Sequence, residues 1–128
     1  MAYTLIAPLR LPQSKKKDFI FNLNVYRVSH YRTLNTMKIR YKEYMRGQIV
    51  TLPKMNKVII DYILYPKTKR RTDLGNVLSI HQKFCEDALV SYNCLTDDDY
   101  KHILETRFRF GFIDKNKPRV EIIITEIN

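Results

Sequence analysis

The spacing of apolar residues along the chain predicts two amphipathic helices. Apolar side chains recur every three or four positions from about Ser29 to Gln48, and again from about Leu74 to Tyr92. This spacing places them along one side of an α-helix, which can then pack against the rest of the protein. The first stripe contains Leu34, Met37, Tyr41, Tyr44 and Met45, with Lys38, Lys42 and Arg46 running beside it. His81 lies on the second stripe, so we expect a hydrogen-bonded core histidine there rather than a catalytic one.

Other segments carry the patterns of β-strands. Apolar and polar residues alternate from Phe19 to Val25, from His102 to Ile113 and from Arg119 to Ile127, whereas Lys57 to Tyr65 is apolar nearly throughout. Alternation is typical of a strand with one buried face, and a continuous apolar run is typical of a strand covered on both faces. The last two alternating segments are joined by turn-forming residues, which predicts a hairpin. Residues 1–17 are expected to form an arm or an edge strand, because their prolines exclude a central strand.

Together these segments predict a single α+β domain over residues 1–128. The expected order is β-α-β-α-β-β, with one mixed sheet and two helices packed on it. A hydrophobic content of 45% is enough for a substantial core in a chain of this length. Several residues are expected to mark helix ends: Asp73 as an N-cap, Asn93 as a C-cap, Gly47 near the end of the first helix, and His30 as a cap or surface residue.

Charge is distributed unevenly along the chain. The net charge is +10, with a balance of +13 over residues 1–72 (16 Lys and Arg against 3 Asp and Glu) and −3 over residues 73–128 (7 against 10). A basic half facing a polyanion, joined to an acidic half, suits a metal-requiring enzyme that acts on nucleic acid. A basic surface that has no ligand is the other interpretation.

The composition also excludes some classes of protein. No apolar run approaches the roughly 20 residues that span a bilayer, and the cations of the first segment follow its apolar part, the reverse of a signal peptide. Cys85 and Cys94 have neither a CxxC nor a zinc-site spacing, so we expect buried or free thiols in a reducing compartment. The expected location is the cytoplasm, with no membrane association and no small-molecule cofactor.

The stretch from Lys69 to Tyr100 holds the candidate chemistry. It begins with a cationic run, Lys69 to Arg71, and it ends with three adjacent carboxylates, Asp97 to Asp99. Cations that hold phosphate, next to carboxylates that hold a hard metal ion, are the parts of a metal-dependent phosphodiesterase. The same residues are also typical of a charged surface helix followed by an acidic loop.

At these positions the sequence resembles the RusA family of Holliday junction resolvases, which are common in phages and prophages. The resemblance depends on the run from Arg70 to Asn76, on Lys83 four residues before the triplet Asp87 to Leu89, and on the pair Asp97-Asp98. The family pattern is RxDxDN, then a lysine before DAL, then a DD pair about eight residues later. The spacing from Asp73 to DAL is about one helical turn longer here than in shorter members of the family. An added turn keeps the same side chains on one face of the helix.

The resemblance implies a Mg²⁺-dependent endonuclease that acts as a homodimer and resolves four-way junctions in DNA recombination and repair. It implies that Asp73 and Asp98 bind Mg²⁺, with Mn²⁺ also accepted and Asp97 close by, and that Lys83 contacts the scissile phosphate. Its supporting residues would be Asn76 and Asp87, and the residues expected to contact DNA phosphates are Lys15, Lys16, Lys17, Lys69, Arg70 and Arg71.

Gly75 departs from the family pattern, because the second aspartate of DxDN falls at this position. Glycine has no side chain to bind a metal, so a neighbour such as Asp97, Asp99 or Asn76 would have to substitute, or activity would be weakened. The alternative function is therefore a junction-binding or RNA-binding protein whose catalytic activity is weak or lost. A small structural protein with a basic surface is a third interpretation.

The length of the second helix limits which carboxylates can meet. A helix from Leu74 to Tyr92 is about 27 Å long, and the steps from Tyr92 to Asp98 span at most roughly 20 Å. Asp98 can therefore hardly reach Asp73 of the same chain unless the helix ends early. We expect either an early helix end or a composite site across a dimer twofold axis, with this helix at the interface. Asp87 lies about 21 Å along the helix from Asp73 and is not expected to share its metal.

Overall fold

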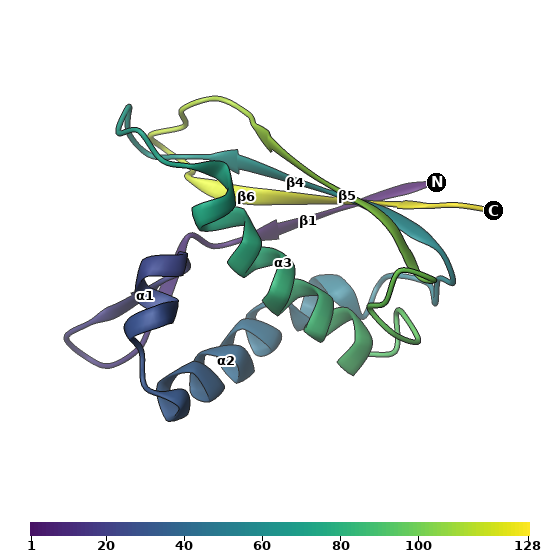
Figure 1. Cartoon of the computed structure of the whole chain (residues 1–128), viewed down its shortest axis with the longest axis horizontal. Coiled ribbons are helices and arrows are strands. Elements are labelled where there is room, and N and C mark those ends of the chain that lie inside the picture. Colours follow the sequence, from purple (N-terminus) through teal and green to yellow (C-terminus); the bar gives the residue numbers. More distant parts are fainter.

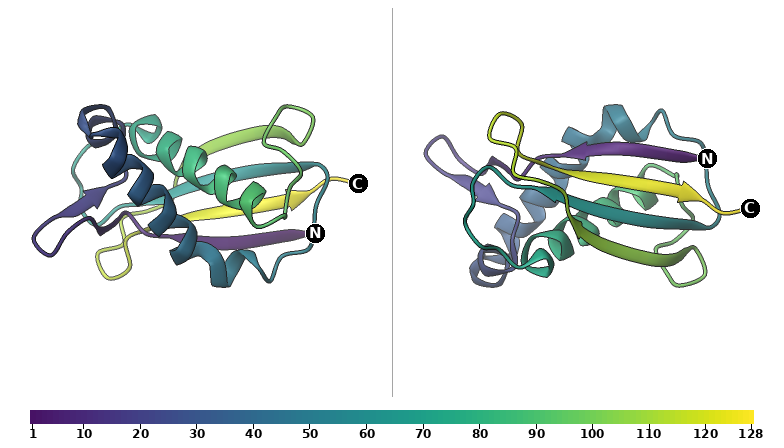
Figure 2. Two further views of the ribbon diagram at one scale, coloured as in Figure 1. Left: turned by 90° about the horizontal axis from the view of Figure 1, so that it is seen from below. Right: turned by 90° about the horizontal axis from the view of Figure 1, so that it is seen from above.

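The computed structural model describes all 128 residues and contains three helices and six strands (Figure 1). The elements follow the chain in the order β1 (Ala2–Ala7), β2 (Arg10–Pro12), β3 (Asp18–Ile20), α1 (Leu23–Val28), α2 (Tyr31–Ile49), β4 (Val58–Tyr65), α3 (Leu74–Ser91), β5 (Ile103–Phe110) and β6 (Arg119–Glu126). Four strands form one mixed sheet, and the helices lie on one of its faces (Figure 2). The α+β class is confirmed, but the predicted order lacked β2 and α1, and it left residues 1–17 as an arm or an edge strand.

The main sheet has the strand order β1-β6-β4-β5. Strand β4 pairs in parallel with β5 and antiparallel with β6, which in turn pairs antiparallel with β1. The predicted hairpin of β5 and β6 is therefore wrong, because β4 lies between them. The most apolar strand, β4, is buried at six of its eight positions and takes a central place. Strand β5 exposes Glu105, Arg107 and Arg109, and these charges suit an edge.

The N-terminal segment completes the sheet as its other edge strand. Ala2 pairs with Thr125 and Ala7 pairs with Val120, so the first strand runs beside the last one. After Pro8 the chain forms a short ribbon of β2 and β3, which closes a loop over residues 13–17. The edge-strand alternative is thus confirmed for residues 2–7.

The strand predicted from Phe19 to Val25 is wrong beyond Ile20. Asn22 is the N-cap of α1, and its side-chain oxygen accepts a hydrogen bond of 2.8 Å from the backbone N–H of Val25. This bond satisfies one of the free N–H groups at a helix start, which favours helix over strand. Phe19 and Phe21 are nevertheless fully buried. The alternating pattern therefore predicted correctly which side chains are buried, but the N-cap hydrogen bond of Asn22 determines that the backbone is helical.

Both predicted long helices are present, and their ends follow from local contacts. His30 caps α2, because its ring accepts a hydrogen bond of 3.1 Å from the N–H of Arg32. Gly47 lies near the C-terminal end of α2, as expected, but the helix continues past it to Ile49, which is buried in the core. Asn93 follows the C-cap of α3 with a φ of 61°, the left-handed conformation that asparagine adopts readily at this position.

The core lies between the helices and the sheet. Phe21, Tyr41 and Phe84 pack edge to face there, with ring centroids 5.3 to 5.7 Å apart. His81 is fully buried in this cluster, and its Nδ1 is 3.1 Å from the hydroxyl of Tyr41. The predicted hydrogen-bonded core histidine is thus confirmed. Burial lowers the pKa of His81 to about 3, so its ring is neutral at physiological pH.

The opposite face of the sheet carries a buried carboxylate. Asp61 in β4 is 3% exposed, and it accepts three hydrogen bonds of 2.6 to 3.0 Å from Arg107 and Arg109 in β5. The hydrogen bond from Arg107 is the main reason that the pKa of Asp61 is lowered. Strand β4 is therefore covered on both faces, as predicted, by helices on one side and by side chains of β5 on the other.

Candidate functional site

Helix α3 carries most of the predicted site residues along its length. Asp73 is its N-cap residue, Asn76 lies in the first turn, Lys83 lies near the middle, and Asp87 lies near the end. The spacings between Asn76, Lys83 and Asp87 keep these three residues on roughly one side of the helix. Asp73 has the position of an N-cap but makes no side-chain hydrogen bond to the helix. Its exposed carboxylate is therefore free to meet a ligand at the start of α3.

A cleft of about 540 Å³ lies between α1, α2, α3 and the loop that follows α3. It brings together three predicted residues, Lys83, Asp87 and Asp98, although Asp98 lies beyond the end of the helix. Lys38 of α2 reaches in from the other wall, and its Nζ is 3.6 Å from the carboxylate of Asp87. The Nζ of Lys83 lies 5.7 Å from the ring centre of Tyr26 in α1. Two lysines and several carboxylates thus face one space.

Glu86 also lines this cleft, and the sequence reasoning missed it. The residue is 7% exposed, and its Oε2 accepts a hydrogen bond of 3.0 Å from the hydroxyl of Tyr62 in β4. Burial raises the pKa of Glu86 to about 7 against the opposing effect of the Tyr62 hydrogen bond, and the charges of Asp98 and Asp87 add to the rise. No sequence motif marks this residue, because its environment depends on the sheet beneath the helix.

Asp98 is the member of the acidic triplet that lines the cleft. Asp97 accepts a hydrogen bond of 2.7 Å from the backbone N–H of Asp98, and Asp99 lies 2.7 Å from the ring of His102. Partial burial and the neighbouring Asp97 raise the pKa of Asp98, whereas the pairing with His102 lowers the pKa of Asp99. The Asp98 end of the cleft therefore has a surplus of negative charge that favours a cation.

The structure does not bring Asp73 to Asp98 within one chain. Helix α3 continues to Ser91, so the early helix end, one of the two predicted alternatives, is wrong. Asp98 lines the same cleft as Asp87, which is about 21 Å along the helix from Asp73. No group of three or more His, Cys, Asp and Glu side chains is placed to hold a metal ion. The cleft carboxylates suit Mg²⁺ or Mn²⁺ in donor type, but they do not complete a site in one chain.

The predicted DNA-binding residues lie at the other end of the molecule, where β4 ends and α3 begins. Lys69, Arg70 and Arg71 are exposed and line a hollow with Phe110 and Ile113. The run of lysines at 15–17 lies in the loop between β2 and β3. Both loops lie at the left end in Figures 1 and 2, and the loop with Asp98 lies toward the right. The cations of these two loops are thus separated from Asp98 within one chain.

A further basic hollow at this end was not predicted. It has a volume of about 610 Å³, and Arg10, Lys67, Lys117 and Arg119 line it together with Tyr44. These cations come from three segments that are distant in the sequence, so no linear pattern links them. The basic surface is therefore wider than the two cationic runs that the sequence indicated.

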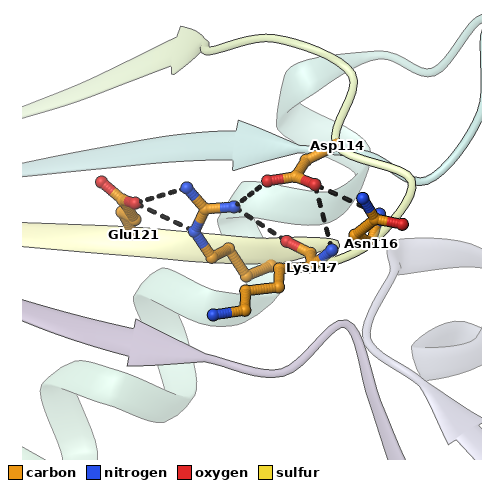
Figure 3. Close-up of polar contacts among 5 residues, drawn as sticks. Asp114, Asn116, Lys117 and Glu121 are labelled. Atoms are coloured by element: carbon orange, nitrogen blue, oxygen red, sulfur yellow. Dashed lines mark hydrogen bonds and ion pairs between the residues drawn. The ribbon is translucent and has the colours of Figure 1, made fainter.

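Arg119 fixes the loop between β5 and β6 next to this hollow. Its guanidinium donates hydrogen bonds of 2.8 Å to Asp114 Oδ2 and to the carbonyl of Lys117, and it pairs with Glu121 (Figure 3). Asp114 Oδ1 in turn accepts hydrogen bonds from the backbone N–H groups of Asn116 and Lys117. Two carboxylates thus neutralise Arg119, so the side chain of Lys117 is better placed than Arg119 to meet a phosphate.

Three further findings bear on identity. Cys85 and Cys94 are free and buried, in line with the expected thiols. None of the helices combines the length and the apolar composition that crossing a bilayer requires. Comparison with protein-family models and with curated proteins gives no match to this chain.

Proposed function

We propose that the chain is a metal-dependent, structure-specific endonuclease that cuts branched DNA such as four-way junctions. The main support is the cleft shared by Lys83, Asp87 and Asp98. The resemblance to the RusA family selected all three residues. Lys83 and Asp87 are neighbours on α3 through their spacing alone, so the support comes from Asp98, which reaches the same cleft from the loop after the helix. Cations and carboxylates around one space are what hydrolysis of a phosphodiester requires.

Each charged residue of the cleft would have its own role in hydrolysis of the phosphodiester. Lys83 would bind the scissile phosphate and stabilise the charge that develops on it. Asp98 would hold Mg²⁺ or Mn²⁺, which prefer oxygen ligands, together with a carboxylate from outside the cleft. When bound, the metal would neutralise charge on the phosphoryl group and lower the pKa of the attacking water. Lys38 would orient Asp87 through their ion pair.

The additional carboxylate would be Asp73 of a second copy. In a homodimer with the two α3 helices antiparallel across a twofold axis, the start of each helix lies near the end of the other. A mixing experiment tests this arrangement with Asp73→Asn and Asp98→Asn chains, each inactive alone. Mixed dimers contain one intact site, so mixing should restore up to about a quarter of the cleavage activity. No recovery after mixing of two folded proteins would contradict a composite site.

The basic loops would bind the phosphates of the DNA arms. Lys67, Lys69, Arg70, Arg71 and Lys117 are all exposed, and the loops that carry them, after β4 and before β6, lie at the same end of the molecule (Figure 1). Phosphate contacts position a duplex without reading its bases, which suits an enzyme selective for DNA shape. Binding should weaken steeply with salt, by about 0.9 units of log K per log unit of salt for each phosphate contact.

A cleavage assay on a synthetic four-way junction tests the proposed activity. The wild type should cut in Mg²⁺ or Mn²⁺, and Asp98→Asn should bind the junction without cutting it. Asp99→Asn is the matched control, because Asp99 is engaged by His102 and does not line the cleft; this variant should still cut. Cleavage by Asp98→Asn at the wild-type rate would contradict the assignment of the cleft.

A second candidate is a protein that binds junctions or RNA without cutting. Gly75, which lacks the family carboxylate, favours it, as does the lack of a grouped metal-binding set in one chain. Salt-sensitive binding to the junction, with no cutting at any Mg²⁺ or Mn²⁺ concentration, would support this candidate. A chain that shows no salt-sensitive binding to nucleic acid would contradict both functions and leave a basic surface without a ligand.

A further inference from the structure

A second hollow continues the cleft away from its carboxylates. It has a volume of about 580 Å³ and includes Tyr31 and Arg32 at the start of α2. Tyr26 and Lys38 line this hollow and also the cleft that contains Asp98. The two hollows therefore adjoin at Tyr26 and Lys38, and together they are called the groove here, with carboxylates at one end and an aromatic ring beside a guanidinium at the other.

Tyr31, at the far end of the groove, presents an aromatic ring to solvent. The residue is 68% exposed, its ring centroid is 4.5 Å from that of His30, and the Cζ of Arg32 lies 5.9 Å from its ring centre. An exposed aromatic ring next to a cation can stack on an unpaired base while the cation attracts the adjoining phosphate. Tyr100 is more exposed, at 80%, but lines neither hollow.

The length of the groove matches a short piece of single strand. The stretch of α2 from Tyr31 to Lys38 is about 10 Å long. At a spacing of about 3.4 Å for stacked bases, this corresponds to about three nucleotides. If one phosphate of a DNA strand lies between Lys38 and Lys83, the base about three nucleotides further along that strand would therefore lie over the ring of Tyr31. A fully paired duplex offers no free base face at that distance.

We infer that the groove binds an unpaired stretch of DNA next to the branch point, and that Tyr31 stacks on one of its bases. The role of the groove extends the proposed function and rests on it for the choice of DNA as the ligand. Forks and flaps carry unpaired bases at the branch point, and a fully paired four-way junction would have to open there when it binds. Stacking on Tyr31 would then favour branched DNA without reading its sequence.

Two short probes that differ only in their bases test this role. Fluorescence anisotropy in EDTA, which prevents metal-dependent cleavage, measures binding of a fluorescein-labelled oligo(dT) and of an abasic deoxyribose-phosphate oligomer of equal length. The wild type should bind oligo(dT) about fivefold or more tightly than the abasic oligomer, and Tyr31→Ala should remove that preference. Tyr31→Phe keeps the ring and should keep the preference. Tyr100→Ala, at a tyrosine that is exposed but lines neither hollow, should keep it too.

Equal affinity of the wild type for both probes would overturn the role of the groove. Equal weakening of both probes by Tyr31→Ala would also overturn it, because the loss would then be structural or due to phosphate contacts. Junction cleavage by the wild type in Mg²⁺ is measured separately. A base preference that depends on Tyr31, without cleavage, supports the groove and contradicts the nuclease function; cleavage without a base preference contradicts the groove alone.

Discussion

Replacing Gly75 by aspartate tests the start of α3 both as a helix terminus and as part of a metal site. The glycine is the second residue of the helix and is exposed, and a Cβ built on it has no atom within 4 Å. An aspartate side chain therefore fits without displacing its surroundings. It also supplies the carboxylate that the RusA pattern has at this position, close to Asp73.

The expected gain in stability follows from helix propensity and the helix dipole. Glycine costs about 1 kcal/mol relative to alanine inside a helix, and aspartate costs about half of that, so the exchange gains about 0.5 kcal/mol. The first turn of α3 has no acidic residue, and a carboxylate placed there adds about 0.3 to 1 kcal/mol. The free energy of unfolding should therefore rise by about 1 kcal/mol, which corresponds to a Tm increase of about 3 to 5 °C. Gly75→Asn, with nearly the same shape but no charge, should gain only about half as much.

Thermal unfolding with and without Mn²⁺ measures both effects. Mn²⁺ should raise the Tm of Gly75→Asp by more than that of Gly75→Asn, because a ligand that binds the folded state adds RT ln(1 + [L]/Kd) to its stability. Cleavage of a four-way junction should increase in parallel. Equal Tm values for the two variants without metal would refute the dipole argument. Equal responses to Mn²⁺ would refute the idea that this position borders a metal site.

Four other substitutions probe the cleft, the sheet and the glycines. The pKa of Glu86 is raised to about 7, so the wild type should lose up to about 3 kcal/mol as the pH rises from about 4.5 to 7. Urea unfolding should therefore find Glu86→Gln more stable than the wild type at pH 8 but not at pH 4. Asp61→Asn should cost about 3 kcal/mol at pH 7, because two arginines lose their shared partner. The pKa of Asp61 is lowered, so this cost should shrink as the pH falls through the usual pKa range of an aspartate and below it, and a cost independent of pH would contradict the ion pair. Gly111→Ala should lower the Tm and cost about 1 to 3 kcal/mol of stability, because the new Cβ would overlap the ring of Tyr65. Gly47→Ala should instead stabilise the protein by about 1 kcal/mol, because its Cβ would meet no other atom. Equal Tm changes for the two variants would contradict this contrast.

Sequence periodicity predicted the long helices well because each of them buries one face. The stripe of α2 indicated Met37, Tyr41 and Met45, and all three are fully buried. Periodicity failed where a local hydrogen bond decided the backbone, as at Asn22, whose side chain begins a helix in the middle of an alternating segment. It also failed for the pairing of β5 and β6. A short turn-rich connection favours a hairpin locally, but the strongly apolar β4 gains more by having a partner on both sides.

The candidate site was predictable only in part, for a similar physical reason. The family resemblance selected Lys83 and Asp98, and both line the cleft. Glu86 could not be predicted, because its burial depends on the sheet beneath α3 and on the hydroxyl of Tyr62. The hollow that contains Arg10 and Lys117 depends on loops that meet only after the sheet has formed. Motifs can thus identify residues that act together along a helix, but not those that long-range pairing brings together.

The length of α3 accounts for two separations that one chain cannot resolve. Asp98 lines the cleft beside Asp87, which is about 21 Å along α3 from Asp73, and the cationic run from Lys69 to Arg71 precedes Asp73. A single DNA strand would need about six stacked nucleotides to cross that distance. An antiparallel pair of α3 helices would place both the carboxylate and the cations of one copy beside Asp98 of the other. One dimer geometry would thus bring both Asp73 and the cationic run close to Asp98. Sedimentation at the assay concentration tests it: a chain that cuts junctions while it remains monomeric would contradict this geometry.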